Sequence, residues 1–123
     1  MIQRFTIPNY RPPPKNQLMR RTLRRSIKLR KECHEFIATY AKLSGMVKAT
    51  GPRRVSLAIN LKGRQREYDY DALIASVSDA LVACGMLIGD REGQAFWGGV
   101  KYSREGEHGT TIILEDLYDT GTV

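Results

Sequence analysis

The amino-acid sequence predicts an α+β domain, a small mixed β-sheet packed with two main helices. Two observations lead to this prediction. Two segments carry apolar residues at three- and four-residue steps, and several short segments alternate between apolar and polar residues. The 123 residues fit a single domain, residues 1–123, and the hydrophobic fraction of 41% is enough for one core.

The first part of the chain predicts a strand, a loop and a long helix. Residues 1–7 alternate imperfectly between apolar and polar side chains, which favours an edge strand that Pro8 ends. Three consecutive prolines predict an extended loop over residues 9–16, because proline disfavours both helix and strand pairing. Apolar residues at helical spacing then predict a helix from about residue 23 to residue 43 or 44.

The second part of the chain predicts a strand, a helix and two further strands. Strict alternation favours a half-buried strand over residues 55–61. A helix is expected over residues 71–84, and two strands are expected over 96–102 and 110–117. The pair Gly98–Gly99 weakens the first of these two strands, which indicates a bulge or the close approach of another backbone.

The net charge of +7 is distributed very unevenly along the chain. Residues 1–66 hold 17 Lys and Arg against two Glu, a charge of +15, whereas residues 67–123 hold 3 Lys and Arg against 11 Asp and Glu, a charge of −8. Nine basic residues and no acid lie between Arg11 and Lys31, in a segment that we call the basic arm (residues 9–31). This polarity favours nucleic acid as the partner of one surface, and a cation or a protein as the partner of the acidic region, residues 67–123.

Several other classes of protein are disfavoured. The longest apolar run, residues 80–89, is too short to span a bilayer, and no amphipathic helix carries an aromatic apolar face, so we expect no membrane partner. The N-terminus lacks a basic-then-apolar signal, which predicts a cytoplasmic protein. Cys33 and Cys84 form neither a CxxC pair nor a metal-ligand spacing, so we expect two reduced thiols.

Three aspartates are the candidate catalytic and metal-binding residues. Asp69 and Asp71 stand at the start of the second predicted helix, and Asp90 follows its far end. Such a helix rises about 21 Å. The six residues 85–90 span a similar length when extended, so Asp90 reaches the other two if this segment packs back along the helix. Oxygen-only ligands favour Mg²⁺, with Mn²⁺ as a substitute. A simpler interpretation is that Asp71 caps the helix and Asp69 interacts with the helix dipole.

The aspartates belong to a longer pattern that resembles a known family, the RusA-type Holliday junction resolvases. The family pattern is Asp-x-Asp-Asn-Leu … Asp-Ala-Leu … Gly … Asp, and this chain has Asp69-Tyr70-Asp71-Ala72-Leu73, then Asp79-Ala80-Leu81, Gly85 and Asp90. The proline-rich segment 7–16 is similar to the loop that follows the first strand in that family. The resemblance spans most of the chain in matching order. It implies a RusA-like fold and a homodimeric, Mg²⁺-dependent endonuclease whose metal ligands are Asp69, Asp71 and Asp90.

The leading hypothesis is therefore an Mg²⁺-dependent endodeoxyribonuclease that resolves four-way DNA junctions by paired hydrolysis of two phosphodiester bonds. Each site cuts one strand, so symmetric resolution requires a homodimer. We expect basic side chains to bind the phosphates of the junction arms, with selectivity for shape rather than base sequence. These candidate DNA-binding residues are Arg11, Lys15, Arg20, Arg21, Arg24, Arg25, Lys62, Arg64 and Arg66.

Two other functions stay open. Ala72 and Ala75 stand where the family pattern has Asn and Lys, which is compatible with a non-catalytic module that binds branched DNA. A basic protein that binds another protein is the third hypothesis. Trp97 and Tyr102 are expected in the core or at an interface rather than stacked on bases.

Overall fold

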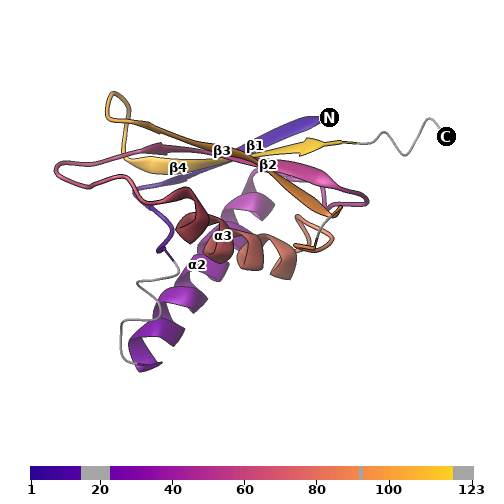
Figure 1. Ribbon diagram of the computed structural model, residues 1–123, viewed down its shortest axis with the longest axis horizontal. Helices are drawn as coiled ribbons and strands as arrows, with labels where there is room; N and C mark the ends of the chain where they lie inside the picture. The colour runs from indigo at the N-terminus through magenta and orange to yellow at the C-terminus, as the bar shows by residue number, and fades with distance from the viewer. Residues whose placement is uncertain (15–22, 92, 118–123) are drawn as a thin grey trace.

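A four-stranded mixed sheet forms one layer of the protein, and two helices form a second layer on one face of that sheet (Figure 1). The computed structural model describes residues 1–14, 23–91 and 93–117. Its elements are β1 (Ile2–Pro8), α2 (Leu23–Leu43), β2 (Arg53–Asn60), α3 (Tyr70–Ala83), β3 (Ala95–Ser103) and β4 (Gly109–Asp116).

The strands lie in the order β1-β4-β2-β3. β4 is antiparallel to both of its neighbours, β1 and β2, whereas β2 and β3 are parallel. Helix α3 is the crossover between these two parallel strands, because a parallel pair needs a long connection. The start of α3 therefore follows the end of β2, and the end of α3 precedes the start of β3.

One hydrophobic core lies between the sheet and the helices. The strands alternate as the sequence predicts, so every second side chain of β2 is buried. α2 and α3 each contribute a stripe at helical spacing, for example Cys33, Ile37 and Ala41 on α2. Burial of each large apolar side chain contributes roughly 1.5–3 kcal/mol to stability. The largest fully buried apolar side chains are Ile7, Ile37, Val55, Leu57, Ile59, Leu73, Val77, Leu81, Leu87, Ile112 and Leu114.

The structure confirms the predicted α+β class, the mixed sheet and the two helices, with element bounds within about two residues of those expected. It also confirms the bulge in β3. Val55 pairs with Trp97 and the next residue, Ser56, pairs with Gly99, so Gly98 is the extra residue. A Cβ atom at Gly98 would collide with the hydroxyl of Ser56, which explains why glycine stands there.

The first half of α2 extends away from the sheet (Figure 1). Its buried residues begin only at Cys33, ten positions after the helix starts. Leu23 and Ile27 are exposed there, as are Arg24 and Arg25. Residues 23–31 of the basic arm therefore form a largely solvent-exposed cationic helix, and the stability of this part depends on the packed second half of α2.

A buried arginine fastens the start of β2. Arg53 is only 2% exposed, and its guanidinium donates hydrogen bonds to the Asp116 carboxylate at 2.7 Å, the Met86 carbonyl at 3.0 Å and the Val47 carbonyl at 2.8 Å. The Met86 contact ties the turn after α3 to β2. Because a buried charge is costly unless it is paired, these partners fix the position of that turn.

Candidate functional site

Two carboxylates stand at the start of α3. The N-cap residue is Asp69, with extended backbone angles of φ −61° and ψ 140°, and its side chain makes no capping hydrogen bond. The prediction that Asp71 caps this helix is wrong, because Tyr70 is already helical and Asp71 lies in the first turn. There its charge interacts favourably with the positive end of the helix dipole. Both aspartates are exposed, and neither carboxylate has a hydrogen-bond or ion-pair partner among the described residues.

Asp90 lies in the turn between α3 and β3. This turn stays close to the C-terminal end of α3. The backbone N–H of Met86 bonds back to the Leu81 carbonyl at 2.9 Å, so the chain turns sharply where the helix ends. The backbone N–H of Arg53 then bonds to the Gln94 carbonyl at 3.3 Å, close to the start of β3. The segment 86–94 is held beside the start of β2 at both ends. The segment therefore does not pack back along α3, so the arrangement that would bring Asp90 to Asp69 and Asp71 within one chain is wrong.

The three aspartates therefore do not gather within one chain. Fourteen helical residues separate the start of α3 from its end, a length of about 21 Å. Among residues 1–14, 23–91 and 93–117, no group of three or more His, Cys, Asp and Glu side chains lies close enough to hold a metal ion. One chain offers the pair Asp69 and Asp71 at one end of α3 and Asp90 near the other.

A tyrosine on β3 holds the residue that precedes Asp69. The Tyr102 hydroxyl accepts a hydrogen bond from the backbone N–H of Tyr68 and donates one to the Tyr68 carbonyl, each at 3.0 Å. Burial raises the pKa of Tyr102, so its phenol keeps the proton that it donates. The sequence predicted only a core or interface position for this side chain. Its contact with the segment that leads to the carboxylates depends on the sheet order.

Arg11, near the N-terminus, also contacts Tyr68. Its guanidinium lies 3.8 Å from the centroid of the Tyr68 ring, and it donates a hydrogen bond to the Tyr68 hydroxyl at 2.7 Å. A second hydrogen bond reaches the Arg66 carbonyl. Cation–π contacts of this kind contribute roughly 0.5–2 kcal/mol. Arg11 therefore has a structural role in this region, besides the phosphate contact that the sequence suggested.

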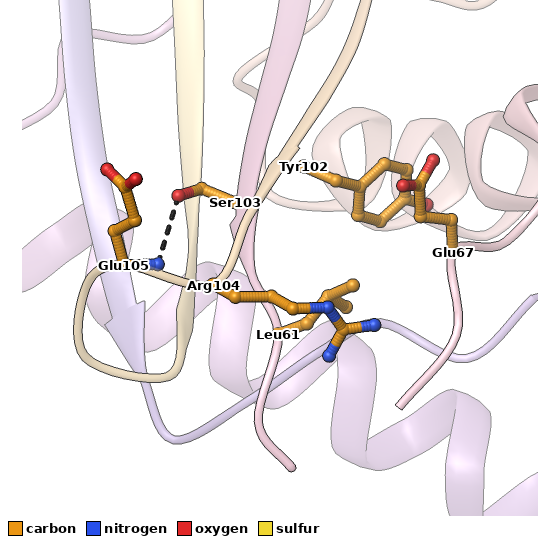
Figure 2. Close-up of a pocket in the computed structure, with 6 residues that line it drawn as sticks. All are labelled: Leu61, Glu67, Tyr102, Ser103, Arg104 and Glu105. Atoms are coloured by element: carbon orange, nitrogen blue, oxygen red, sulfur yellow. Dashed lines mark hydrogen bonds between the residues drawn. The ribbon is translucent and has the colours of Figure 1, made fainter. Parts of the chain in front are cut away.

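Arg104 is a third side chain that holds this segment, and no sequence pattern predicted this role. It donates hydrogen bonds to the backbone carbonyls of Gly63, at 2.8 Å, and Gln65. Figure 2 shows its guanidinium beside Leu61, at a surface hollow of about 480 Å³ that Glu67 and Tyr102 also line. We call Arg11, Tyr102 and Arg104 the loop clamp. Together they fix residues 63–68, the connection between β2 and the two carboxylates.

The predicted DNA-binding residues fall into three groups. Arg24 and Arg25 are exposed at the start of α2, and the cations of the turn after β2 are exposed a few residues before Asp69. Arg11 is half-buried in the loop clamp. Lys15, Arg20 and Arg21 lie outside the described residues. The exposed turn residues are Lys62, Arg64 and Arg66.

Comparison with models of known protein families finds no match, and a search of curated proteins finds none either. Within the described residues, no helix is both long enough and apolar enough to cross a membrane.

Proposed function

We propose that this chain is a metal-dependent, structure-selective DNA endonuclease that acts as a homodimer on four-way junctions, as the RusA-type resolvases do. One observation carries the proposal. Asp69 and Asp71 stand exposed at the start of α3, the N-cap carboxylate leaves its capping role unused, and exposed cations lie a few residues away on the same connection. One capping side chain is enough for a helix N-terminus. Capping alone therefore explains neither the second carboxylate nor the side chains that hold the preceding connection.

The donor set suits Mg²⁺ better than a transition metal. Mg²⁺ commonly binds one or two protein carboxylates and completes its octahedron with water and substrate phosphate. Asp69 and Asp71 supply such a pair, and we place the third carboxylate, Asp90, on the second copy of the chain, because about 21 Å of helix separates it from the pair in its own copy. Bound there, the ion supplies Lewis-acid polarisation of the scissile phosphate and a lowered pKa of the attacking water.

The remaining residues bind and orient the substrate. Lys62, Arg64 and Arg66 precede the carboxylates on a connection held by the loop clamp, and they neutralise phosphates next to the scissile bond. The exposed start of α2 brings further cations to a neighbouring DNA arm. A two-fold dimer presents two such sites, one for each strand of a symmetric junction.

The first experiment measures cleavage of a synthetic four-way junction with and without Mg²⁺, together with the melting temperature. Mg²⁺ should support cleavage and raise the melting temperature of the wild type, because a ligand of the folded state stabilises it. Asp90→Asn should abolish both effects and leave DNA binding intact. Asp79→Asn is the matched control, since Asp79 is also exposed, on α3 itself. The proposal would be refuted if millimolar Mg²⁺ or Mn²⁺ neither supported cleavage by the wild type nor changed its melting temperature.

A mixing experiment tests whether the site is shared between copies. The Asp90→Asn variant and the Asp69→Asn/Asp71→Asn double variant are each expected to be inactive. If the site is shared, their heterodimer contains one intact set of three carboxylates and one set without any. Mixing should then restore nicking of one strand, without paired cleavage. No restored activity after confirmed subunit exchange would mean that Asp90 acts within its own chain or not at all.

The second candidate function is a non-catalytic module that binds branched DNA. It is favoured by Ala72 and Ala75, which replace the Asn and Lys of the family pattern. Tight junction binding without cation-dependent cleavage would establish it.

A further inference from the structure

A hollow of about 310 Å³ lies against the segment that leads to the aspartate pair. Four segments that are far apart in the sequence form its wall: the loop after β1, helix α2, the connection after β2 and the turn before β4. Pockets for small ligands begin at about 300 Å³, so this hollow has the size for a single nucleobase or nucleoside. The lining residues used below are Tyr10, Arg11, Glu32, Gln65, Tyr68 and His108.

The loop after β1 is held in place before any ligand binds. The backbone N–H of Asn9 donates a hydrogen bond to the His108 carbonyl at 2.8 Å. The Tyr10 carbonyl accepts one from the Thr110 hydroxyl at 2.8 Å, and the next residue, Arg11, belongs to the loop clamp. A site whose backbone is already fixed loses little conformational entropy when a ligand binds.

Two flat groups of the wall suit a stacked base. The Tyr10 ring packs against Phe36, with the ring centroids 4.7 Å apart, and the Arg11 guanidinium lies over the Tyr68 ring. Unpaired bases stack on aromatic rings and on the planes of arginine side chains. The hollow therefore offers the kind of surface on which a base binds.

Glu32 is the polar group that most restricts the ligand. It is the first acidic residue of the chain and directly follows the basic arm, and its carboxylate has no hydrogen-bond or ion-pair partner among the described residues. A carboxylate repels phosphate but accepts a hydrogen bond from the amino group of a base. His108 adds a second acceptor. Its Nδ1 donates to the Asn60 carbonyl at 2.7 Å, because a carbonyl only accepts, so Nε2 of the neutral ring is an acceptor.

We propose that this hollow holds one unpaired nucleobase of the DNA substrate, a base whose exocyclic amino group donates a hydrogen bond to Glu32. Adenine, cytosine and guanine carry such a group, whereas thymine has only oxygen atoms outside its ring nitrogens and its methyl group. Tyr68 lines the hollow and directly precedes Asp69, so the bound base belongs to a nucleotide near the strand that reaches the carboxylates. Extrusion costs least for a base that is already unpaired. The inference rests on the proposed function and adds which bases the site accepts.

Binding of labelled single-stranded oligonucleotides, measured by fluorescence anisotropy, tests the inference. Oligo(dC) and oligo(dT) of one length carry the same number of phosphates, so their affinity ratio reports on the bases. The wild type should bind oligo(dC) at least about fivefold more tightly than oligo(dT). Glu32→Gln should reduce the ratio to within about twofold, because the glutamine amide also donates to thymine oxygen atoms. Glu35→Gln is the matched control. It removes the same charge at an exposed position on α2 outside the hollow, and the ratio should stay unchanged.

Nuclear magnetic resonance with free deoxycytidine, which has no phosphate, locates the bound base on the wild type. Deoxycytidine at millimolar concentration should shift the signals of Gln65 and His108 and leave those of Lys101, an exposed residue on β3, in place. Thymidine should shift them much less. Equal affinity of the wild type for the two oligonucleotides, or a preference that survives Glu32→Gln, overturns the inference. If the base preference is present and no branched DNA is cut, the pocket stands and the proposed function fails. Cleavage without base preference has the opposite meaning.

Discussion

The phenolic oxygen of Tyr102 joins the N–H and the C=O of a single residue, Tyr68, at 3.0 Å each. The two residues are 34 positions apart in sequence, one near the end of β3 and the other just before α3. This contact fixes the backbone immediately before Asp69. The exposed aspartate pair is thus supported by a side chain of the neighbouring strand.

Tyr102→Phe should weaken the response to Mg²⁺ more than it weakens the fold. The substitution keeps the ring and removes both hydrogen bonds to Tyr68, which we expect to cost about 1 kcal/mol in the free energy of unfolding. The Mg²⁺ concentration needed for half-maximal cleavage should rise severalfold, because Asp69 loses its fixed position. Tyr40→Phe is the control, since Tyr40 is half-buried and its hydroxyl has no hydrogen-bond partner among the described residues. Parallel losses of stability and of metal response in both variants would argue against a positioning role.

Arg53 and Arg54 are adjacent in sequence and should differ greatly in their effect on stability. Arg53→Met leaves Asp116 and three carbonyl groups without their buried donor, so we expect urea denaturation to show a loss of about 3 kcal/mol. Arg54 is 49% exposed in its ion pair with Glu115, and Arg54→Met should cost less than about 1 kcal/mol. Similar losses for the two variants would contradict the role assigned to Arg53 as the buried anchor of the turn after α3.

Stability should fall in alkaline solution because of a buried thiol. Burial raises the pKa of Cys33 from 9.0 to about 11, and it also raises the pKa of Tyr10. The unfolded chain then loses its thiol proton first, so the full stability is present below pH 9 and is lost as pH rises toward 11. The slope for one thiol approaches about 1.4 kcal/mol per pH unit.

Cys33→Ala isolates this contribution. Its free energy of unfolding, measured by urea denaturation from pH 8 to 11, should decline less steeply than that of the wild type. Cys84→Ala should change the slope less, because Cys84 is only half-buried. An identical slope in the wild type and Cys33→Ala would show that the thiol does not titrate as proposed.

Binding to a four-way junction should depend steeply on salt. Each phosphate contact contributes about −0.9 to the slope of log K against log salt, so four contacts reduce affinity by about two orders of magnitude between 50 and 200 mM. Replacing Arg20, Arg21, Arg24 and Arg25 by Gln should reduce the slope by about 3.6. The matched control replaces Arg4 and Lys101, two exposed cations on the strands, and should leave the slope unchanged. An unchanged slope in the fourfold variant would mean that the basic arm makes no phosphate contacts.

The sequence by itself determined the elements and the chemistry they carry. Strict alternation in β2 and helical spacing in α2 specify local structure through the face that each element buries, so their bounds follow from side-chain pattern alone. The Gly98–Gly99 pair indicated the bulge because glycine weakens regular strand pairing, and Gly99 adopts a φ of +111° that other residues rarely adopt. The charge division and the aspartate spacing are likewise properties of the chain.

Only the tertiary structure decided which of these residues meet. Placing Asp90 required the direction in which the chain leaves α3, and that depends on the contacts of Arg53 with Met86 and Gln94, residues 33 and 41 positions further along the chain. The loop clamp likewise depends on sheet order, because β3 lies beside β2 and brings Tyr102 to Tyr68. Side-chain pattern specifies which face of an element is buried, whereas long-range contacts between polar groups specify where its ends lie. The parallel crossover through α3 therefore separates carboxylates that their sequence spacing allowed to come together.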